Sequence, residues 1–344
     1  MFNLPNELVG VVISYSNKPV AATLALLNRR YNRIATPFLY EKVTLKKRRQ
    51  VRAFHWALVQ RPAFHGYVRT LELLTLTIGV FYPDAKPEED TKQLLMKLPQ
   101  LVNLVLNVDH YSMTYLFNQP EYPFLLRRFS ANSIKSKGFI KFLESQNRIE
   151  SICLKPHAGL GRTPGVLPVL EPHVLPNLRQ IDAVATTVMN LVPSRPVSRI
   201  SVDRSWDRSY GMYNAIPRST APLTYFRDQI KLSWGPWGAQ VLELIEKLGH
   251  NPEELKELVI HIVVSDNGDR NTLAQLWVNF DPTTLNTLAD IRSYLTKFCN
   301  LSKFRLEGLI GGHPNHPELQ FGLWEKSCPL LEEFTLFNVT VKRA

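Results

Sequence analysis

The sequence predicts an α/β protein in which a short helical module precedes a solenoid built on a parallel sheet. Two observations support this class. Apolar residues recur at helical spacing close to the N-terminus. Beyond them, one short apolar pattern recurs along the rest of the chain. We expect the helical module to occupy residues 1–45 and the solenoid to occupy residues 46–344.

The composition is that of an ordinary globular protein. The 344 residues are 44% hydrophobic and 21% charged. No targeting segment and no run of 18 apolar residues is visible, so we expect no contact with a membrane. The three cysteines are an odd number and lie far apart, which argues against a disulfide framework. This favours a reducing compartment, and therefore a cytoplasmic or nuclear location.

The net charge of +11 is concentrated at one end of the chain. Of the 41 Lys and Arg residues, 12 lie within residues 1–70, whereas only 2 of the 30 Asp and Glu residues do. The rest of the chain is nearly neutral. A nucleic-acid-binding protein that used most of its length would be basic throughout, so the distribution makes a nucleic-acid partner a minor expectation.

Residues 4–45 read as three compact helices. The first begins with residues 4–8, where Pro5 is near the first helical position and Glu7 lies in the first turn. The segment Asn17-Lys18-Pro19 separates it from a second helix at about residues 19–27. A third helix covers about residues 28–36, and Thr36-Pro37 is expected to end it.

The rest of the chain carries nine copies of a pattern with two residues between its first and second apolar positions. Val68-x-x-Leu71-x-Leu73 is an example. The copies begin at Val68, Leu101, Leu126, Ile149, Leu178, Val197, Leu255, Leu301 and Leu331. Amphipathic stretches precede several of them, at residues 93–98, 139–143 and 241–248. This order is typical of a leucine-rich-repeat solenoid, in which each strand–helix unit buries its apolar face against the next.

Two points about the repeats stay open. An α/β domain whose buried strands begin with the same pattern would also alternate helices and strands. Residues 203–225 look like a long loop, and the 46 residues between Ile260 and Leu306 indicate an insertion or a degenerate repeat.

The N-terminal helices resemble the F-box, a three-helix motif. Residues 4–8, 12–15 and 24–35 carry the resemblance, and residues 36–40 resemble the connection between an F-box and following repeats. Gly10, Ser16 and Tyr31 depart from the usual family pattern. The resemblance implies that the module docks on the Skp-type adaptor of a cullin–RING ubiquitin ligase, while irregular leucine-rich repeats hold a protein substrate. A scaffold with an F-box but no role in ubiquitylation is an alternative.

Physical reasoning also points to a partner for these helices. Three short helices can bury little surface among themselves, so apolar residues in excess of their small core need other contacts. The expected adaptor-binding residues are Leu4, Pro5, Leu8, Ile13, Leu24, Leu27 and Tyr31. The alternative is that about half of them pack inside the module or against the first repeat.

The strands predict where a substrate binds. Because side chains alternate along a strand, the residues that flank the second apolar position of each copy should face the open side of the sheet. These residues are mixed in charge, which favours a protein substrate over a polyanion. The candidate substrate-binding residues are Arg199, Trp234, Trp237, Lys303, Arg305 and Glu333. The two tryptophans lie in a Gly-Pro segment that we expect to be a loop, where they either anchor a partner or cap the core.

Residues 42–52 support a competing hypothesis. The run Lys46-Lys47-Arg48-Arg49, with Arg52, could bind nucleic acid or an acidic surface, or could act as a nuclear import signal. It could equally form a solvated turn between the first strand and a helix at residues 51–58. Neither a nucleotide loop nor a catalytic motif is present, and His313 and His316 lack further ligands at metal-binding spacing. We expect a non-enzymatic protein with no catalytic residues, cofactor or metal.

Overall fold

The structure is a computed structural model. It describes residues 4–76, 87–108, 110–118, 121–132, 136–155, 167–203, 211–232, 237–249, 254–265, 273–274, 276–278, 282–311 and 317–343. The chain divides into two compact units, and each is described by itself below. The first is Met1–Ile152 with His157–Gly159, and the second is Cys153–Pro156 with Leu160–Ala344.

The first unit begins with three helices, α1 (Asn6–Tyr15), α2 (Lys18–Leu27) and α3 (Arg29–Glu41). Asparagine side chains cap two of them. Asn17 accepts a hydrogen bond from the backbone N–H of Val20, and Asn28 accepts one from the N–H of Tyr31. The three-helix arrangement at the N-terminus is therefore confirmed.

The end of the third helix was predicted wrongly. The helix does not stop at Thr36-Pro37 but continues through Pro37 to Glu41. Proline removes one helical hydrogen bond and weakens a helix. Packing offsets that cost, because Phe38 and Leu39 lie against the module's core. Tyr40 packs against Phe64, with ring centroids 4.5 Å apart and ring planes tilted by 36°.

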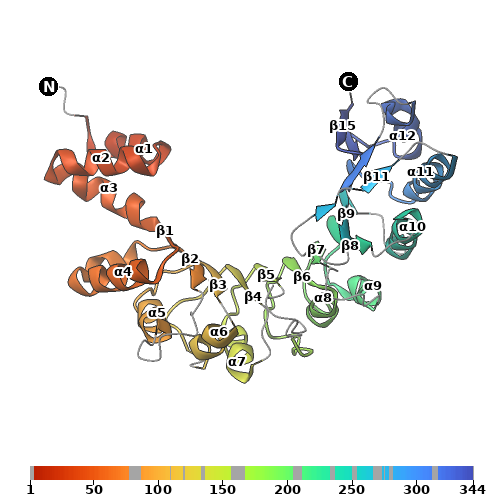
Figure 1. Ribbon diagram of the computed structural model, residues 1–344. Coiled ribbons are helices and arrows are strands. Elements are labelled where there is room, and N and C mark those ends of the chain that lie inside the picture. The colour runs from red at the N-terminus through yellow and green to blue at the C-terminus, as the bar shows by residue number, and fades with distance from the viewer. Residues whose placement is uncertain are drawn as a thin grey trace. The chain divides into compact units, whose positions relative to one another are not determined.

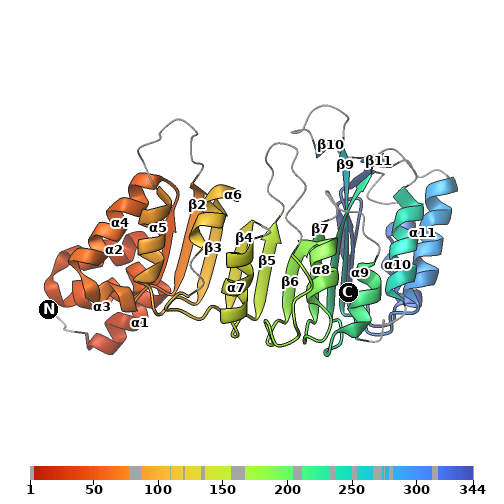
Figure 2. The same cartoon turned by 90° about the horizontal axis from the view of Figure 1, so that it is seen from below.

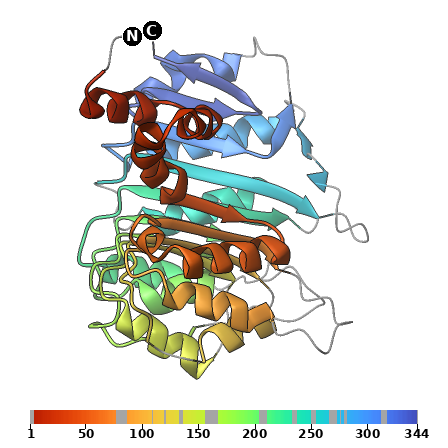
Figure 3. The same cartoon turned by 90° about the vertical axis from the view of Figure 1, so that its left-hand side faces the viewer.

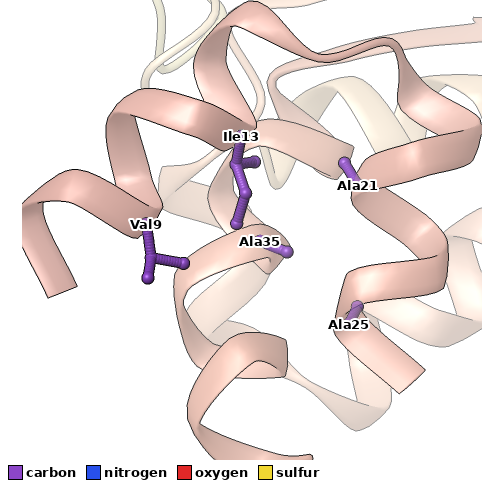
Figure 4. Close-up of a cluster of buried hydrophobic side chains, with 5 residues drawn as sticks. All are labelled: Val9, Ile13, Ala21, Ala25 and Ala35. Carbon is purple, nitrogen blue, oxygen red and sulfur yellow. The ribbon is translucent and has the colours of Figure 1, made fainter. Parts of the chain in front are cut away.

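The core of this module is small. Its buried residues are Val9 and Ile13 of α1, Ala21 and Ala25 of α2, and Ala35 of α3 (Figure 4). The small side chains of the alanines allow the helices to approach closely. Figure 3 shows the three helices in dark red. Arg30 ties the start of α1 to α3, since its Nε donates to Asn6 Oδ1 at 2.6 Å.

The remainder of the first unit is a layer of parallel strands covered by helices. The strands are β1 (Lys42–Leu45), β2 (Thr70–Leu76), β3 (Asn103–Val108), β4 (Arg128–Asn132) and the beginning of β5 (Ser151–Lys155). The helices are α4 (Arg48–Gln60), α5 (Pro87–Met96), α6 (His110–Leu116) and α7 (Lys137–Ser145), with a 3-10 turn at Pro62–Gly66. Within the described residues, these helices lie on one face of the strands only (Figure 1). The sheet begins at Lys42, which is before the boundary expected at residue 45.

The second unit repeats the same plan. Its parallel strands are β6 (Gln180–Val184), β7 (Arg199–Asp203), β8 (Tyr225–Leu232), β9 (Glu257–Ser265), β12 (Lys303–Glu307) and β14 (Glu333–Leu336). The helices are α8 (Ala185–Leu191), α9 (Met212–Ala215), α10 (Trp237–Leu248), α11 (Pro282–Leu295) and α12 (Phe321–Ser327). They cover one face of the strands (Figure 2). Strand β15 (Val339–Lys342) pairs with β14 in the antiparallel sense.

Shorter elements complete the second unit. Strand β10 (Leu273–Ala274) pairs with the end of β9, and β11 (Leu276–Val278) pairs with β13 (Leu309–Gly311). Short 3-10 turns occupy Ile216–Arg218 and Pro317–Leu319. A buried arginine, Arg195, pins one loop of this unit. It is 1% exposed, and its guanidinium donates to the carbonyl oxygens of Leu170, Glu171, Val174, Leu191 and Pro193 at 2.7–3.2 Å.

The strand pattern is confirmed. Each of the nine copies coincides with the start of a parallel strand, and the central apolar residues point into the core. Leu104, Ile152, Ile200 and Phe304 are all 1% exposed or less. Their neighbours Asn103, Ser151, Arg199 and Lys303 are not buried. The α/β class and the mainly parallel, repeat-like sheet follow from these observations.

Besides the short strands β10, β11 and β13 and the antiparallel β15, two described parallel strands, β1 and β8, lack a copy of the pattern. Strand β1 fits it only if Tyr40 is counted as the first apolar position. In β8, the third apolar position is filled by Asp228, which is fully buried and accepts a hydrogen bond from the Tyr213 hydroxyl at 3.0 Å. This hydrogen bond offsets part of the cost of burying the Asp228 carboxyl, and the strand forms although the sequence pattern breaks there.

The segment at residues 203–225 is not simply a loop. Asp203 ends β7, Tyr225 begins β8, and α9 lies between them with Met212 and Tyr213 buried. Residues 204–210 lie outside the described residues. The interval between Ile260 and Leu306 contains α11, as a degenerate repeat would.

Candidate protein-binding surfaces

The helical module exposes more large apolar side chains than it buries. Leu8 is 50% exposed, Val12 56%, Leu27 62% and Leu26 85%. The exposed large apolar residues of α1 and α2, together with Leu4 two positions before α1, are Leu4, Leu8, Val11, Val12, Tyr15, Val20, Leu26 and Leu27. We call this set the N-terminal apolar surface. Such a concentration on about 30 residues marks an interaction surface more often than a solvated one.

The predicted adaptor-binding residues differ in burial: four are exposed, two are half-buried and one is buried. Leu4, Pro5, Leu8 and Leu27 are exposed. Leu24 and Tyr31 are half-buried and pack against the module's core.

Ile13 is a correction, because it is 1% exposed and cannot contact a partner while the module is folded. It lies one helical turn after Val9, and both side chains form the buried stripe of α1. For α2, the sequence did indicate which residues are exposed. In α2 the small residues Ala21 and Ala25 mark the buried stripe, which leaves Leu26 and Leu27 outside it.

The basic run joins β1 to α4. Arg48 begins the helix, and the backbone N–H groups of Lys46 and Lys47 donate to Gln50 Oε1 at 2.7 and 3.0 Å. Because these residues lie at the start of α4, their positive charges are at the positive end of the helix dipole. The first turn of α4 contains no acidic residue that would offset them. Two guanidinium nitrogens of Arg48, Nε and Nη2, are buried without a hydrogen-bond partner.

Ion pairs already occupy part of this basic segment. Lys42 Nζ lies 2.6 Å from Glu72 Oε1, and Arg52 Nε lies 2.7 Å from Asp90 Oδ2. The hydrogen bond from Lys42 lowers the pKa of the Glu72 carboxyl below its ordinary value. Lys46, Lys47 and Arg49 are exposed and make no ion pair with another described residue.

In the second unit, four of the predicted substrate-binding residues lie on the helix-free face of the strands. Register places Arg199 beside Tyr225, and it places Glu257, Lys303 and Glu333 in the same row on the following strands. The Arg199 guanidinium lies over the Tyr225 ring, 4.2 Å from its centroid. Arg199 is exposed, and a guanidinium in a cation–π contact can still bind acidic groups through its N–H donors.

Arg305 and Glu333 bind each other rather than standing free. Arg305 Nη2 lies 2.9 Å from Glu333 Oε1, and Lys342 Nζ lies 3.6 Å from Glu333 Oε2. Burial raises the pKa of Glu333, but the hydrogen bond from Arg305 and nearby cations outweigh it, and the pKa is lowered. A substrate must therefore add to this pair or compete with it.

The prediction for Trp237 was wrong. Trp237 begins α10 and is 9% exposed, so it packs in the core and does not anchor a partner. Trp234 lies outside the described residues.

The same face carries a cluster that the sequence pattern missed. Glu307 Oε2 lies 3.3 Å from His261 Nδ1 and 4.0 Å from Arg227 Nη2. The hydrogen bond from His261 lowers the pKa of the Glu307 carboxyl, with partial burial acting against it. Arg227 lies on β8, the strand whose pattern is broken by Asp228, which explains why the cluster was not predicted.

A hollow of about 260 Å³ lies beside this cluster, where the strands of the second unit approach their C-terminal ends. Its lining includes Asp182, Asp203, Lys155, Arg227 and Gln229. Cys153 Sγ donates to Asp182 Oδ2 at 3.4 Å. The hollow offers both signs of charge together with amide and hydroxyl groups, which suits hydrogen bonding to the polar side chains of a peptide.

No family model and no curated protein matches the chain. Among solved structures, it is similar to a protein from Bacteroides fragilis, a structural-genomics target known from a crystal structure. That alignment has a TM-score of 0.35 and 10% sequence identity, and it covers 99% of this chain and 74% of the other. A likeness at that level supports no functional assignment. Within the described residues, no helix is long and apolar enough to cross a membrane, and no group of three or more His, Cys, Asp or Glu residues could hold a metal ion.

Proposed function

We propose that this protein is a substrate-recognition subunit of a Skp–cullin–F-box type ubiquitin ligase. In this proposal the N-terminal apolar surface binds the Skp-type adaptor, and the helix-free face of the strands binds a protein substrate. The observation that carries it is the imbalance within the module, in which five buried residues, three of them alanines, support eight exposed large apolar ones. The resemblance of residues 2–45 to an F-box supplies the identity of the adaptor.

Co-purification with a Skp-type adaptor tests the first half of the proposal. The full chain should retain the adaptor, and Leu8→Asp combined with Leu27→Asp should abolish retention, because charges would enter an apolar interface. Leu330→Asp is the matched control. Leu330 is 53% exposed, close to the 50% of Leu8, but it belongs to the second unit. Loss of the adaptor with the control variant as well, or no retention by the wild-type chain, would refute adaptor binding through this surface.

The substrate half needs a separate experiment. Proteins captured by the wild-type chain should be lost when Arg199→Glu is introduced, because Arg199 is exposed on the helix-free face and its guanidinium lies over the Tyr225 ring. Lys303→Glu combined with Arg305→Glu should have a similar effect. Ubiquitylation of a captured protein in a reconstituted ligase separates a receptor from a scaffold that has no role in ubiquitylation.

A second candidate function is binding of an acidic surface or nucleic acid through residues 42–52. The charges at the start of α4 favour it, since Lys46, Lys47 and Arg49 are exposed at the positive end of a helix dipole. Such binding should weaken steeply with salt and should disappear when these three residues are changed to Glu. Retention of nucleic acid by that variant would exclude this candidate.

A further inference from the structure

The first unit also contains a hollow, separate from the one in the second unit, and the proposed function does not use it. Its volume is about 610 Å³, and it lies at the edge where the parallel strands of the unit begin. Three arginines line it, namely Arg69, Arg127 and Arg148, all of them exposed. One carboxylate, Glu41, also lines it. The hollow therefore carries a net positive charge, and its size is within the range of sites that bind small ligands or short peptide segments.

The repeat geometry sets the spacing of the arginines. The N–H of Val102 donates to the carbonyl of Arg69 at 2.9 Å, and the N–H of Arg127 donates to the carbonyl of Val102 at 2.8 Å. Arg69 and Arg127 thus occupy equivalent positions on strands that are two apart. Because neighbouring strands are about 4.8 Å apart, these two arginines leave the backbone roughly 9–10 Å from each other.

The guanidinium groups are only weakly neutralised. Arg69 Nη1 donates to a neutral acceptor, Gln100 Oε1, at 2.8 Å. Arg127 Nε lies 4.0 Å from Glu150 Oε1, which is the outer limit of an ion pair. Arg148 forms no ion pair with another described residue. Planar guanidinium donors in this state bind oxyanions well, since charge-assisted hydrogen bonds are among the strongest in proteins.

The rest of the lining indicates what carries the oxyanions. Leu125 is 41% exposed, and Pro99 and Pro123 lie with it in the hollow. Apolar surface beside arginines suits a peptide. Among the described residues that line the hollow none is aromatic, so these residues offer bases no ring on which to stack. We infer that this hollow binds an acidic segment of a protein partner, with its carboxylates on the arginines and its apolar atoms on Leu125.

A defined probe follows from the spacing. In a polyproline II helix, residues three apart lie on the same side and about 9 Å apart along the axis. A fluorescein-labelled proline-rich peptide with Glu at every third position therefore presents carboxylates at roughly the separation of Arg69 and Arg127. The same peptide with Gln in place of Glu keeps the shape and removes the charge. Binding of both to the full chain is measured by fluorescence anisotropy.

The Glu peptide should bind at least about tenfold more tightly than the Gln peptide, and more weakly as salt increases. Arg127→Gln combined with Arg148→Gln should weaken binding about tenfold. Arg179→Gln is the matched control, because Arg179 is exposed and precedes β6 as Arg127 precedes β4, but lies in the second unit. All variants should share the wild-type thermal midpoint, since these side chains are on the surface.

Two results would overturn the inference. One is equal affinity for the Glu and Gln peptides, or full affinity in the Arg127/Arg148 variant. The other is displacement of the Glu peptide by a single-stranded oligodeoxythymidylate at lower concentration than by unlabelled Glu peptide, which would assign the hollow to nucleic acid. Adaptor binding does not enter these measurements, so the inference stands or falls apart from the proposed function.

Discussion

Apolar residues of α1 and α2 should divide cleanly between those that bind the adaptor and those that stabilise the fold. Leu8, Val12 and Leu27 are 50–62% exposed, whereas Ile13 is 1% exposed. Burying a fully exposed side chain of this size contributes roughly 1.5–3 kcal/mol, so each half-exposed residue offers about 1 kcal/mol to an interface. Changing all three to alanine should therefore cost about 3 kcal/mol of binding, or about a hundredfold in Kd for the adaptor.

The same substitutions should leave folding almost unchanged. The triple variant should lose less than about 1 kcal/mol of unfolding free energy, because its side chains lie outside the core of the module. Ile13→Ala should lose about 2–4 kcal/mol, since it opens a cavity beside Val9 and Ala35. Titration calorimetry with the purified adaptor and urea denaturation followed by circular dichroism give the two quantities. Unchanged adaptor affinity in the triple variant, or a stability loss equal to that of Ile13→Ala, would refute the assignment of the N-terminal apolar surface.

Other substitutions test the fold and its charges. Gly10→Ala should raise the unfolding free energy by about 0.5–1 kcal/mol, because an added Cβ meets only Ile34 Cγ2 at 3.9 Å. Gly308→Ala should lower it by more than about 2 kcal/mol, because Gly308 has a φ of 85° and its Cβ would lie 1.9 Å from the Ile262 carbonyl oxygen; equal thermal midpoints for the two variants would contradict both expectations. Arg195→Met should cost about 3–5 kcal/mol in urea denaturation, because several carbonyl groups lose a buried charged donor, while Arg179→Met on the surface should cost almost nothing. Hydrogen bonding lowers the pKa of Glu307 in the folded protein, so its stabilisation is present above the ordinary value of 4.5 and is lost as the pH falls through the folded pKa. Glu307→Gln should accordingly lose less unfolding free energy than the wild type as the pH falls from about 5.5 to values well below 4.5, and an identical loss would contradict a stabilising contact between Glu307 and His261.

The sequence predicted the repeat strands because burial dictates their pattern directly. Each strand needs apolar residues at alternate positions on its covered face, and nine copies carried that signature. Prediction failed where tertiary contacts replaced the pattern. Asp228 occupies a core position through its hydrogen bond to Tyr213, and Pro37 lies inside a helix that packing at Phe38 and Leu39 sustains. Neither compensation can be read from local sequence.

The candidate sites were predicted less well for a related reason. Spacing shows which residues share a helix face, but not which face of an isolated module is buried, so Ile13 was assigned to the wrong side. Most residues that flank the second apolar position of each copy lie outside the core as predicted, since alternation fixes them, but Val259 and Thr335 are buried. The pairing of Arg305 with Glu333 and the hollow lined by Arg69, Arg127 and Arg148 depend on how neighbouring strands align in register. Register is a property of the assembled sheet.

The antiparallel strand β15 has a consequence for how this protein avoids self-association. Turn residues Phe337 and Asn338, both with positive φ, fold the chain back so that β15 occupies the outer edge of β14. Without it, β14 would present a row of unpaired backbone groups, flanked by the buried apolar side chains of Phe334 and Leu336, to any other β-strand. The hairpin moves the free edge of the sheet from β14 to β15, a strand of four residues with no buried side chain and with Lys342 exposed at its end, and both features disfavour pairing with another chain. Shortening the chain at Leu336 should turn a dispersed protein into one that aggregates through its sheet edge.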